Sequence, residues 1–381
     1  RVGELQMKLF RKKVFDEQKY YAASQWQLIG RKFRRHKLAS VGLVVLGILY
    51  FCAIFCEFLA PYSPQNARTG LKDCPPQRIH IINPETGGLS VPFVYALERE
   101  VDPETLRITY TEDTSRGYPV KLFVRGDPYK MWGLFESDIH LFGVDAGGED
   151  VPVFLFGTDG MGRDMFSRVL YSARISLSIG LVGVLISFIL GCVIGGIAGY
   201  FGGIADVVVQ RVIEFLLSLP TIPIWLALAA ALPAGMPSTQ VYFGITIILS
   251  LLGWTQLARV VRGKLMVLKD EDYVMAARLM GAKGGYIIRK HLLPGFLSYL
   301  IVQVTLSVPS MIIGEAALSF LGLGIQPPSL SWGVMLQEAK TLRAISLYPW
   351  MLIPAIFVVI TVLSFNFVGD GLRDAADPYK Q

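Results

Sequence analysis

Charged side chains are scarce in this chain of 381 residues. Asp, Glu, Lys and Arg make up 17% of the sequence, whereas 52% of the residues are hydrophobic. The apolar residues are gathered in long blocks, a distribution that an ordinary water-soluble domain does not have. The composition therefore predicts a polytopic membrane protein.

Cysteine and histidine are also rare, with four residues of each. Cys52, Cys56 and Cys192 lie inside apolar blocks, so only Cys74 falls in a segment that water can reach. This spacing provides neither a disulfide framework nor a set of metal ligands. We therefore expect no metal-binding residues.

Common catalytic motifs are missing from the sequence. No stretch fits GxxxxGK[ST], so the chain has no phosphate-binding loop and cannot itself hydrolyse ATP in the usual way. HExxH and GxSxG are absent too, which argues against a hydrolase. We predict no catalytic residue and no cofactor in this chain, and any ATP and Mg would be bound by partner subunits.

Six apolar stretches reach or approach the roughly 20 residues that are needed to cross the hydrocarbon layer. The net charge of +6 is concentrated at the ends of these stretches, where basic residues indicate topology and not nucleic-acid binding. The basic segments at 31–37 and 259–290 predict cytoplasmic locations, and an even number of spans returns the C-terminus to that side. The predicted spans are 38–60, 174–200, 212–233, 240–262, 295–321 and 347–369.

Glycine and proline indicate how the spans pack. Gly191, Gly195 and Gly199 recur every four residues in the second span, a pattern that lets two helix backbones approach closely. Prolines predict kinks in the third, fifth and sixth spans. These are Pro220, Pro223, Pro309 and Pro354.

The segment at 61–155 differs from the rest of the chain. Stretches such as RIHII, LRITY and PVKLFVRG favour strands, and NPETGG, DPET and GDP favour turns. We expect a small β-rich insert on the extracytoplasmic side.

Residues 272–294, DYVMAARLMGAKGGYIIRKHLLP, form a polar segment between the fourth and fifth spans. Asp272 and Tyr273 open a predicted helix, Ala276 and Ala277 give it a small face, and Gly281 suits a left-handed C-cap. A helix that docks on another protein and a helix that merely caps the bundle would both show these residues.

The same segment resembles the EAA loop of permease subunits in bacterial ABC importers. Met275 stands where that motif usually has Glu, and His291 stands at a position that is usually apolar. The form looks like the variant of dipeptide and oligopeptide importers. Three other segments, at 157–177, 315–336 and 369–378, also resemble the permeases of these importers. The resemblance therefore covers about 157–378 and the first span, but not the insert. The positions that match the motif are Ala276, Ala277, Gly281, Leu293 and Pro294.

This resemblance implies an all-α polytopic membrane protein with six transmembrane helices of the type I ABC importer permease fold, carrying the β-rich insert. It also implies a bacterial inner-membrane location with both termini cytoplasmic. The expected partners are a second permease subunit, two ATP-binding subunits, an extracytoplasmic substrate-binding protein and the lipid bilayer.

The expected cargo is an oligopeptide or a peptide-like solute, with oligosaccharides or glycosides as an alternative. A further alternative is a self-sufficient channel or secondary carrier, which would require ionisable residues in several spans or an inverted repeat.

The chain is thereby divided into five parts. They are a cytoplasmic amphipathic and basic tail at 1–37, the first span at 38–60, the insert at 61–155, a five-helix permease core at 156–370 with its coupling loop at 271–294, and a cytoplasmic tail at 371–381.

Two sets of residues are candidates for function. Glu315 is the most telling, because an ionisable side chain in an apolar span usually faces a water-filled cavity. The candidates for a translocation path or outer gate are Glu315, Phe320, Gln326 and Trp332. The candidates for coupling to ATPase subunits are Asp272, Tyr273, Ala276, Ala277, Arg278, Gly281, Ala282, Lys283, His291 and Pro294.

Two further polar groups are interpreted as structural. Thr158 or Asp159 is expected to cap the helix that follows, with Arg163 and Asp164 pairing locally. Near the third span, a brace is predicted from Asp206, Arg211 and Glu214.

Overall fold

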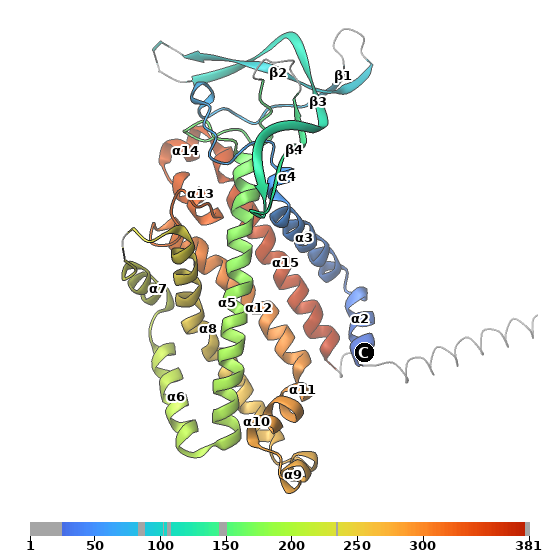
Figure 1. The fold of residues 1–381 in the computed structure, drawn as a ribbon, viewed down its shortest axis with the longest axis vertical. Helices are drawn as coiled ribbons and strands as arrows, with labels where there is room; N and C mark the ends of the chain where they lie inside the picture. Colours follow the sequence, from blue (N-terminus) through green and yellow to red (C-terminus); the bar gives the residue numbers. More distant parts are fainter. Residues whose placement is uncertain are drawn as a thin grey trace, which may run out of the picture.

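A bundle of long helices carries a small antiparallel sheet at one end (Figure 1). The computed structural model describes residues 25–82, 88–101, 103–104, 108–144, 151–233 and 235–377. The predicted N-terminal tail therefore lies largely outside the described residues. The short helix α2 (Gln25–Arg35) and the end of α15 (Ile353–Ala376) lie away from the sheet, and the Lys32 ammonium donates a hydrogen bond to the Asp377 carbonyl oxygen at 3.2 Å.

Among the described residues, five helices are long and apolar enough to cross a membrane. They correspond to the predicted first, second, fourth, fifth and sixth spans, although α5 starts well before the predicted boundary and α15 runs beyond it. These helices are α3 (Lys37–Ile54), α5 (Met165–Phe201), α8 (Ser238–Leu268), α12 (Leu297–Phe320) and α15.

The predicted third span is broken. Helix α6 (Gly203–Ser218) and helix α7 (Thr221–Ala230) meet at a bend of 90°, and together they are long and apolar enough for a sixth span. Leu219 is extended because the ring of Pro220 disfavours a helical conformation at the residue before it. The kink predicted for the third span is confirmed, and at 90° it breaks the span into two helices.

Two of the other proline predictions are wrong, for a common reason. Pro223 lies in the first turn of α7 and Pro354 in the first turn of α15. Proline is tolerated there, because the first backbone N–H groups of a helix have no intrahelical partner. Pro309, in contrast, lies inside α12.

The predicted glycine stripe brings α5 and α8 into direct backbone contact. A Cβ atom on Gly195 would overlap the backbone of Ala258, and one on Gly199 would lie 2.7 Å from the Arg262 carbonyl oxygen. On Gly191 it would lie 2.8 Å from the Leu257 side chain. The close approach predicted from the sequence is confirmed.

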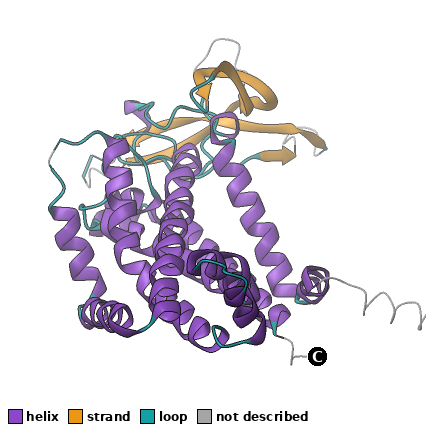
Figure 2. Cartoon of the chain, turned by 60° about the horizontal axis from the view of Figure 1, so that its bottom comes forward, coloured by secondary structure: helices purple, strands orange, loops and turns teal. Residues whose placement is uncertain are grey.

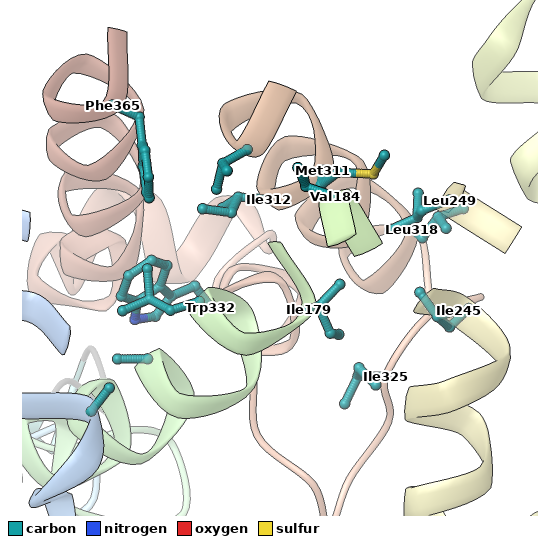
Figure 3. Packing of buried hydrophobic residues seen from close by; sticks show 14 of the residues in the cluster. Ile179, Val184, Ile245, Leu249, Met311, Ile312, Leu318, Ile325, Trp332 and Phe365 are labelled. Atoms are coloured by element: carbon teal, nitrogen blue, oxygen red, sulfur yellow. The ribbon is translucent and has the colours of Figure 1, made fainter. Parts of the chain in front are cut away.

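The main hydrophobic core lies where the spans meet (Figure 3). Side chains from α5, α8, α12 and α15 converge there, together with Trp332 from the short helix α13 (Trp332–Glu338). Its fully buried members include Leu177, Ile179, Ile245, Leu249, Ile312 and Trp332.

The insert is β-rich, as predicted. Its strands form one antiparallel sheet in the order β1-β2-β3-β4, which lies over one end of the helices (Figure 2). The first span connects to it through α4 (Cys56–Leu59). The strands are β1 (His80–Ile82), β2 (Leu89–Val101), β3 (Ile108–Met131) and β4 (Phe135–Val144).

The glycine stripe gives a first prediction. Gly195→Ala should cost about 1–3 kcal/mol, because the new methyl group would push α8 away from α5. Gly47→Ala in α3 is the matched control, since a Cβ there meets nothing within 4 Å. Thermal unfolding of the detergent-purified transporter measures both, and equal unfolding temperatures for the two variants would contradict the packing argument.

Candidate functional site

The loop between α8 and α12 forms a short helix with a complete C-terminal cap. Helix α9 spans Asp272–Leu279, and Gly281 after it has a φ of +82°. The Ala282 N–H donates to the Ala277 carbonyl oxygen at 3.1 Å and the Gly281 N–H to the Arg278 carbonyl oxygen at 2.9 Å. These two bonds and the left-handed glycine define a Schellman motif. The cap predicted at Gly281 is thus present.

One face of α9 is seated on the spans. Val274 and Ala277 are buried in a cluster with residues of α5, α8 and α12. The members of this cluster that come from the spans include Cys192, Leu257, Val261, Leu265 and Leu300. Because both elements share one apolar cluster, α9 is positioned by the spans themselves.

The other face of α9 is exposed and partly apolar. Leu279 and Met280 are 88% and 82% exposed, and Tyr273 and Met275 are about half exposed. Ala276 is exposed beside them. In Figure 1 this helix lies at the end of the bundle opposite the sheet. Exposed side chains of this kind at the end of a helix indicate a surface that another protein could cover.

The predicted polar contacts of the loop fall into two groups. Asp272 and Lys283 are exposed, whereas Arg278 lies over the Tyr200 ring, 5.0 Å from its centroid, and donates to the Tyr200 hydroxyl at 3.3 Å. Arg278 therefore fixes α9 to the end of α5.

His291 and Pro294 lie on the way back to the membrane. His291 is half-buried in the π-helical turn Ile288–Leu292, with its ring 5.7 Å from that of Tyr286. Pro294 lies in the first turn of α11 (Leu293–Gly295).

The predicted brace at the third span is only partly present. Arg211 pairs with Glu214 at 2.9 Å on an exposed face. Asp206 instead accepts two hydrogen bonds from Arg262 of α8, one of them at 2.5 Å. This second pair closes α6 onto α8 near the coupling loop, and no sequence spacing indicates it.

At the other end of the bundle, Glu315 is fully buried inside the chain. Its carboxylate accepts hydrogen bonds from the hydroxyls of Ser176 at 3.1 Å and Ser319 at 2.7 Å. Trp332 is buried as well, and its backbone N–H donates to the Ser176 oxygen at 3.1 Å. These two predicted gate residues share Ser176, and neither has a surface that a cargo could touch in this conformation.

Phe320 and Gln326 are the exposed members of the predicted gate. Phe320 is 39% exposed. Gln326 lines a cavity of about 430 Å³ between the segment at 323–329 and the loop that joins α7 to α8. The structure thus separates the four predicted residues into a buried pair and an exposed pair.

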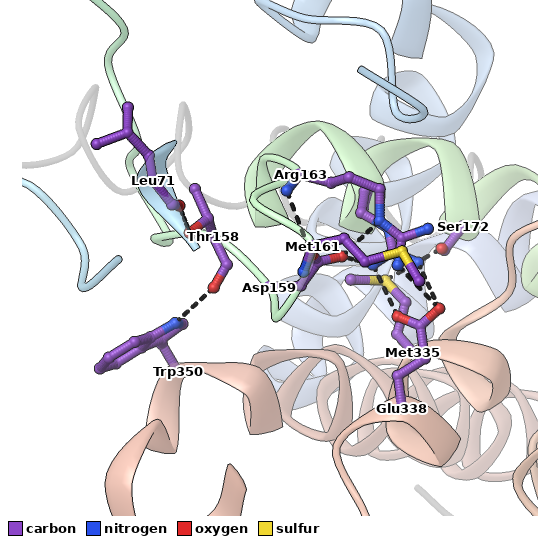
Figure 4. A network of polar contacts seen from close by, with 10 residues as sticks. Leu71, Thr158, Asp159, Met161, Arg163, Ser172, Met335, Glu338 and Trp350 are labelled. Atoms are coloured by element: carbon purple, nitrogen blue, oxygen red, sulfur yellow. Dashed lines mark hydrogen bonds and ion pairs between the residues drawn. The ribbon is translucent and has the colours of Figure 1, made fainter. Parts of the chain in front are cut away.

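A buried ionic network, which sequence reasoning missed, joins the start of α5 to α13 (Figure 4). Arg168 is fully buried and donates to the carboxylates of Asp159 and Glu338, with the latter at 2.7 and 3.0 Å. Arg163 donates to the same two carboxylates at 2.7 and 3.1 Å. Arg168 and Glu338 are 170 residues apart, so no local spacing signals the pair.

The structure differs from the cap and the ion pair that were predicted for residues 158–164. Asp164, and not Thr158 or Asp159, caps α5 by accepting the Ser167 N–H at 2.8 Å. Burial raises the pKa of Asp164 to about 6, although hydrogen bonds from Ser167 lower it. The local pair expected between Arg163 and Asp164 is replaced by the bond from Arg163 to Asp159.

The described residues form a bundle of apolar helices with an exposed helical loop at one end and a small sheet at the other, which is the architecture of a polytopic membrane protein. The sequence profile described as "Binding-protein-dependent transport system inner membrane component" matches residues 191–380. The profile of the N-terminal transmembrane domain of oligopeptide transport permease C matches residues 24–76.

Curated relatives agree with these profiles. The dipeptide transport system permease protein DppC of Bacillus subtilis is 45% identical over 58% of this chain and 68% of its own length. The oligopeptide transport system permease protein OppC of the same organism is 41% identical over 58% and 71%. A putative peptide permease protein of Brucella suis is 41% identical over 66% and 81%.

A solved structure of the MetNI methionine ABC transporter aligns with a TM-score of 0.42 and 21% identity, over 55% of this chain and 97% of that one. From the profiles and the relatives, the chain belongs to the family of inner-membrane components of binding-protein-dependent transport systems. It is a permease subunit of an ABC importer, in which ATP hydrolysis belongs to separate subunits.

The ionic network gives the second prediction. Arg168→Met should cost about 3–5 kcal/mol, because it leaves Asp159 and Glu338 without their buried cation. Arg211→Met is the control, since Arg211 is 79% exposed and such pairs contribute about 0–1 kcal/mol. Thermal unfolding of the purified transporter should separate the two variants, and a similar shift in both would show that the network is not structural.

Proposed function

We propose that this chain forms half of a translocation path for peptides or peptide-like solutes and is driven through the loop at 272–294. The observation that carries the proposal is the two-sided character of α9. Val274 and Ala277 are buried against the spans, whereas Leu279 and Met280 project from the same helix into solvent. A helix held on one side and open on the other can transmit a displacement from a partner to the bundle.

The partner at this surface is an ATP-binding subunit that carries ATP and Mg. Small residues let α9 enter a groove closely, and Gly281 then turns the chain sharply. Leu279, Met280 and Tyr273 supply apolar contact area, and Asp272 and Lys283 set the orientation. Ala282 belongs to the face that packs on the spans and not to the docking surface, because it packs against the buried cluster that contains Val274 and Ala277.

The complete assembly has two permease subunits, two ATP-binding subunits and an extracytoplasmic substrate-binding protein. Basic residues near α9 and before α3 favour a cytoplasmic position for both termini and for the coupling loop in a bacterial inner membrane. The insert then lies on the opposite side, where the binding protein would deliver its cargo.

Phe320 and Gln326 are the residues that this proposal assigns to the path. Both are accessible, and Gln326 lines the cavity beside the loop between α7 and α8. Glu315 and Trp332 have a supporting role in this proposal and do not contact the cargo. Their hydrogen bonds with Ser176 hold the segment that follows α12 in place.

The docking surface gives the third prediction. The double variant Leu279→Ser, Met280→Ser should weaken binding of the ATP-binding subunits about 30-fold or more, since two anchors of about 1–2 kcal/mol each are lost. Folding should be preserved, because both side chains are exposed. Co-purification of the ATP-binding subunits with the permease, and assays of their binding to the immobilised permease, measure the effect.

The control for this variant is Leu342→Ser, an 82% exposed residue near the opposite end of the molecule. It should leave ATPase binding unchanged. Wild-type affinity in the double variant would remove the docking argument.

Cargo gives the fourth prediction. Dipeptide and oligopeptide transport are the functions named for the relatives. In the reconstituted transporter, a binding protein loaded with peptide should stimulate ATP hydrolysis several-fold more than the empty protein. Stimulation by oligosaccharide alone would reassign the cargo, and solute flux without any ATP-binding subunit would instead indicate a channel or carrier.

A further inference from the structure

The tip of the β3–β4 hairpin descends from the sheet to the outer end of the first span (Figure 1). The indole N–H of Trp132 donates to the carbonyl oxygen of Ile54, the last residue of α3, at 2.8 Å. The Trp132 backbone N–H donates to the Glu57 carboxylate at 3.4 Å. The hairpin tip is thus fixed at the level where the span ends.

The level of this contact coincides with the edge of the apolar region. Arg174 of α5 pairs with Glu57 at 2.5 Å and donates to the carbonyl oxygens of Ala53 and Ile54 at 3.1 and 3.0 Å. Beyond Arg174, α5 continues as an apolar helix. An ion pair at this depth marks the boundary between the hydrocarbon layer and the headgroups.

The side chains at the tip are apolar and face outward. Trp132, Leu134 and Phe135 are 48%, 75% and 63% exposed. The tip is bracketed by an exposed ion pair between Lys130 and Glu136 at 2.9 Å. A short apolar turn between charged flanks suits insertion of the turn with the charges held at the headgroups.

Aromatic rings connect this tip to the exposed face of the span. The rings of Phe51 and Phe55 are 4.8 Å apart, and those of Phe55 and Trp132 are 5.7 Å apart. Phe51 belongs to an exposed apolar stripe of α3 that faces away from the bundle. The stripe comprises Val41, Val44, Ile48 and Phe51.

Backbone strain accompanies this arrangement. Trp132 and Phe123 have φ values of +53° and +56°, a region that bulky residues rarely adopt. Both rings pack against the segment that leaves the span, Trp132 on Phe55 and Phe123 on Phe58 at 6.1 Å. Backbone strain is kept where it serves a function, so the strain at these two exposed aromatic residues indicates that their exposure is functional.

We propose that the tip at 131–135 is a membrane anchor, in which Trp132, Leu134 and Phe135 insert into the outer interface of the lipid bilayer. The tip continues the exposed stripe of a membrane-crossing helix, so the lipid that surrounds α3 also reaches the hairpin. Tryptophan and other aromatic side chains prefer this interfacial depth. The anchor would hold the sheet at a fixed height above the translocation path.

The test uses the complete transporter in lipid nanodiscs with an environment-sensitive fluorophore on Leu134→Cys or Phe135→Cys. Shallow nitroxide lipids should quench most of the fluorescence at both positions, and iodide in the buffer should quench little. Leu89→Cys on β2 is the control, because Leu89 is 89% exposed on the sheet. Its label should respond to iodide and not to the nitroxide lipids.

Two results would overturn the anchor. Iodide quenching at 134 and 135 equal to that at 89 would place the tip in water, and protection from both quenchers would place it against another protein subunit. As a second measurement, Leu134→Asp with Phe135→Asp should speed amide hydrogen exchange of residues 131–135 in nanodiscs. Unchanged exchange would count against insertion in the same way.

Discussion

The close approach of α5 and α8 is the constraint on which the rest of the structure depends. Gly191, Gly195 and Gly199 remove the side chains that would otherwise separate the two helices. The backbone of α8 lies against Gly195 and Gly199, and the Leu257 side chain lies against Gly191. In the membrane, where apolar burial gives little drive for helix association, such contacts supply van der Waals packing.

Helix α5 links the two ends of the molecule. Its 37 residues extend about 55 Å at 1.5 Å per residue. At one end, Arg168 and Ser176 hold α13 and the segment around Trp332. At the other end, Tyr200 holds Arg278 of the coupling loop. A displacement of α9 would therefore reach α13 and the segment around Trp332 through the single helix α5.

Local features were predictable from the sequence, whereas long-range pairings were not. Apolar length located five spans, alternation located the sheet, and the glycine period identified the helix contact, because each signal is local. The 90° break at Leu219 exceeds what Pro220 alone predicts. Glu315, Asp206 and Arg168 each have one partner far along the chain, at 139, 56 and 170 residues, and only the tertiary fold reveals these pairs.

Because Arg278 of the coupling loop is bound to Tyr200 of α5, we expect the loop and the outer end of α5 to move as one body. Spin labels at Met161→Cys and Lys290→Cys, both exposed positions, would report the distance between them once the four native cysteines are replaced by alanine. The measurement is pulsed electron double resonance on the complete transporter, without nucleotide and with bound ATP. We expect the same distance distribution in both states. A distance that changes on ATP binding would show that the loop moves independently of α5 and would contradict this expectation.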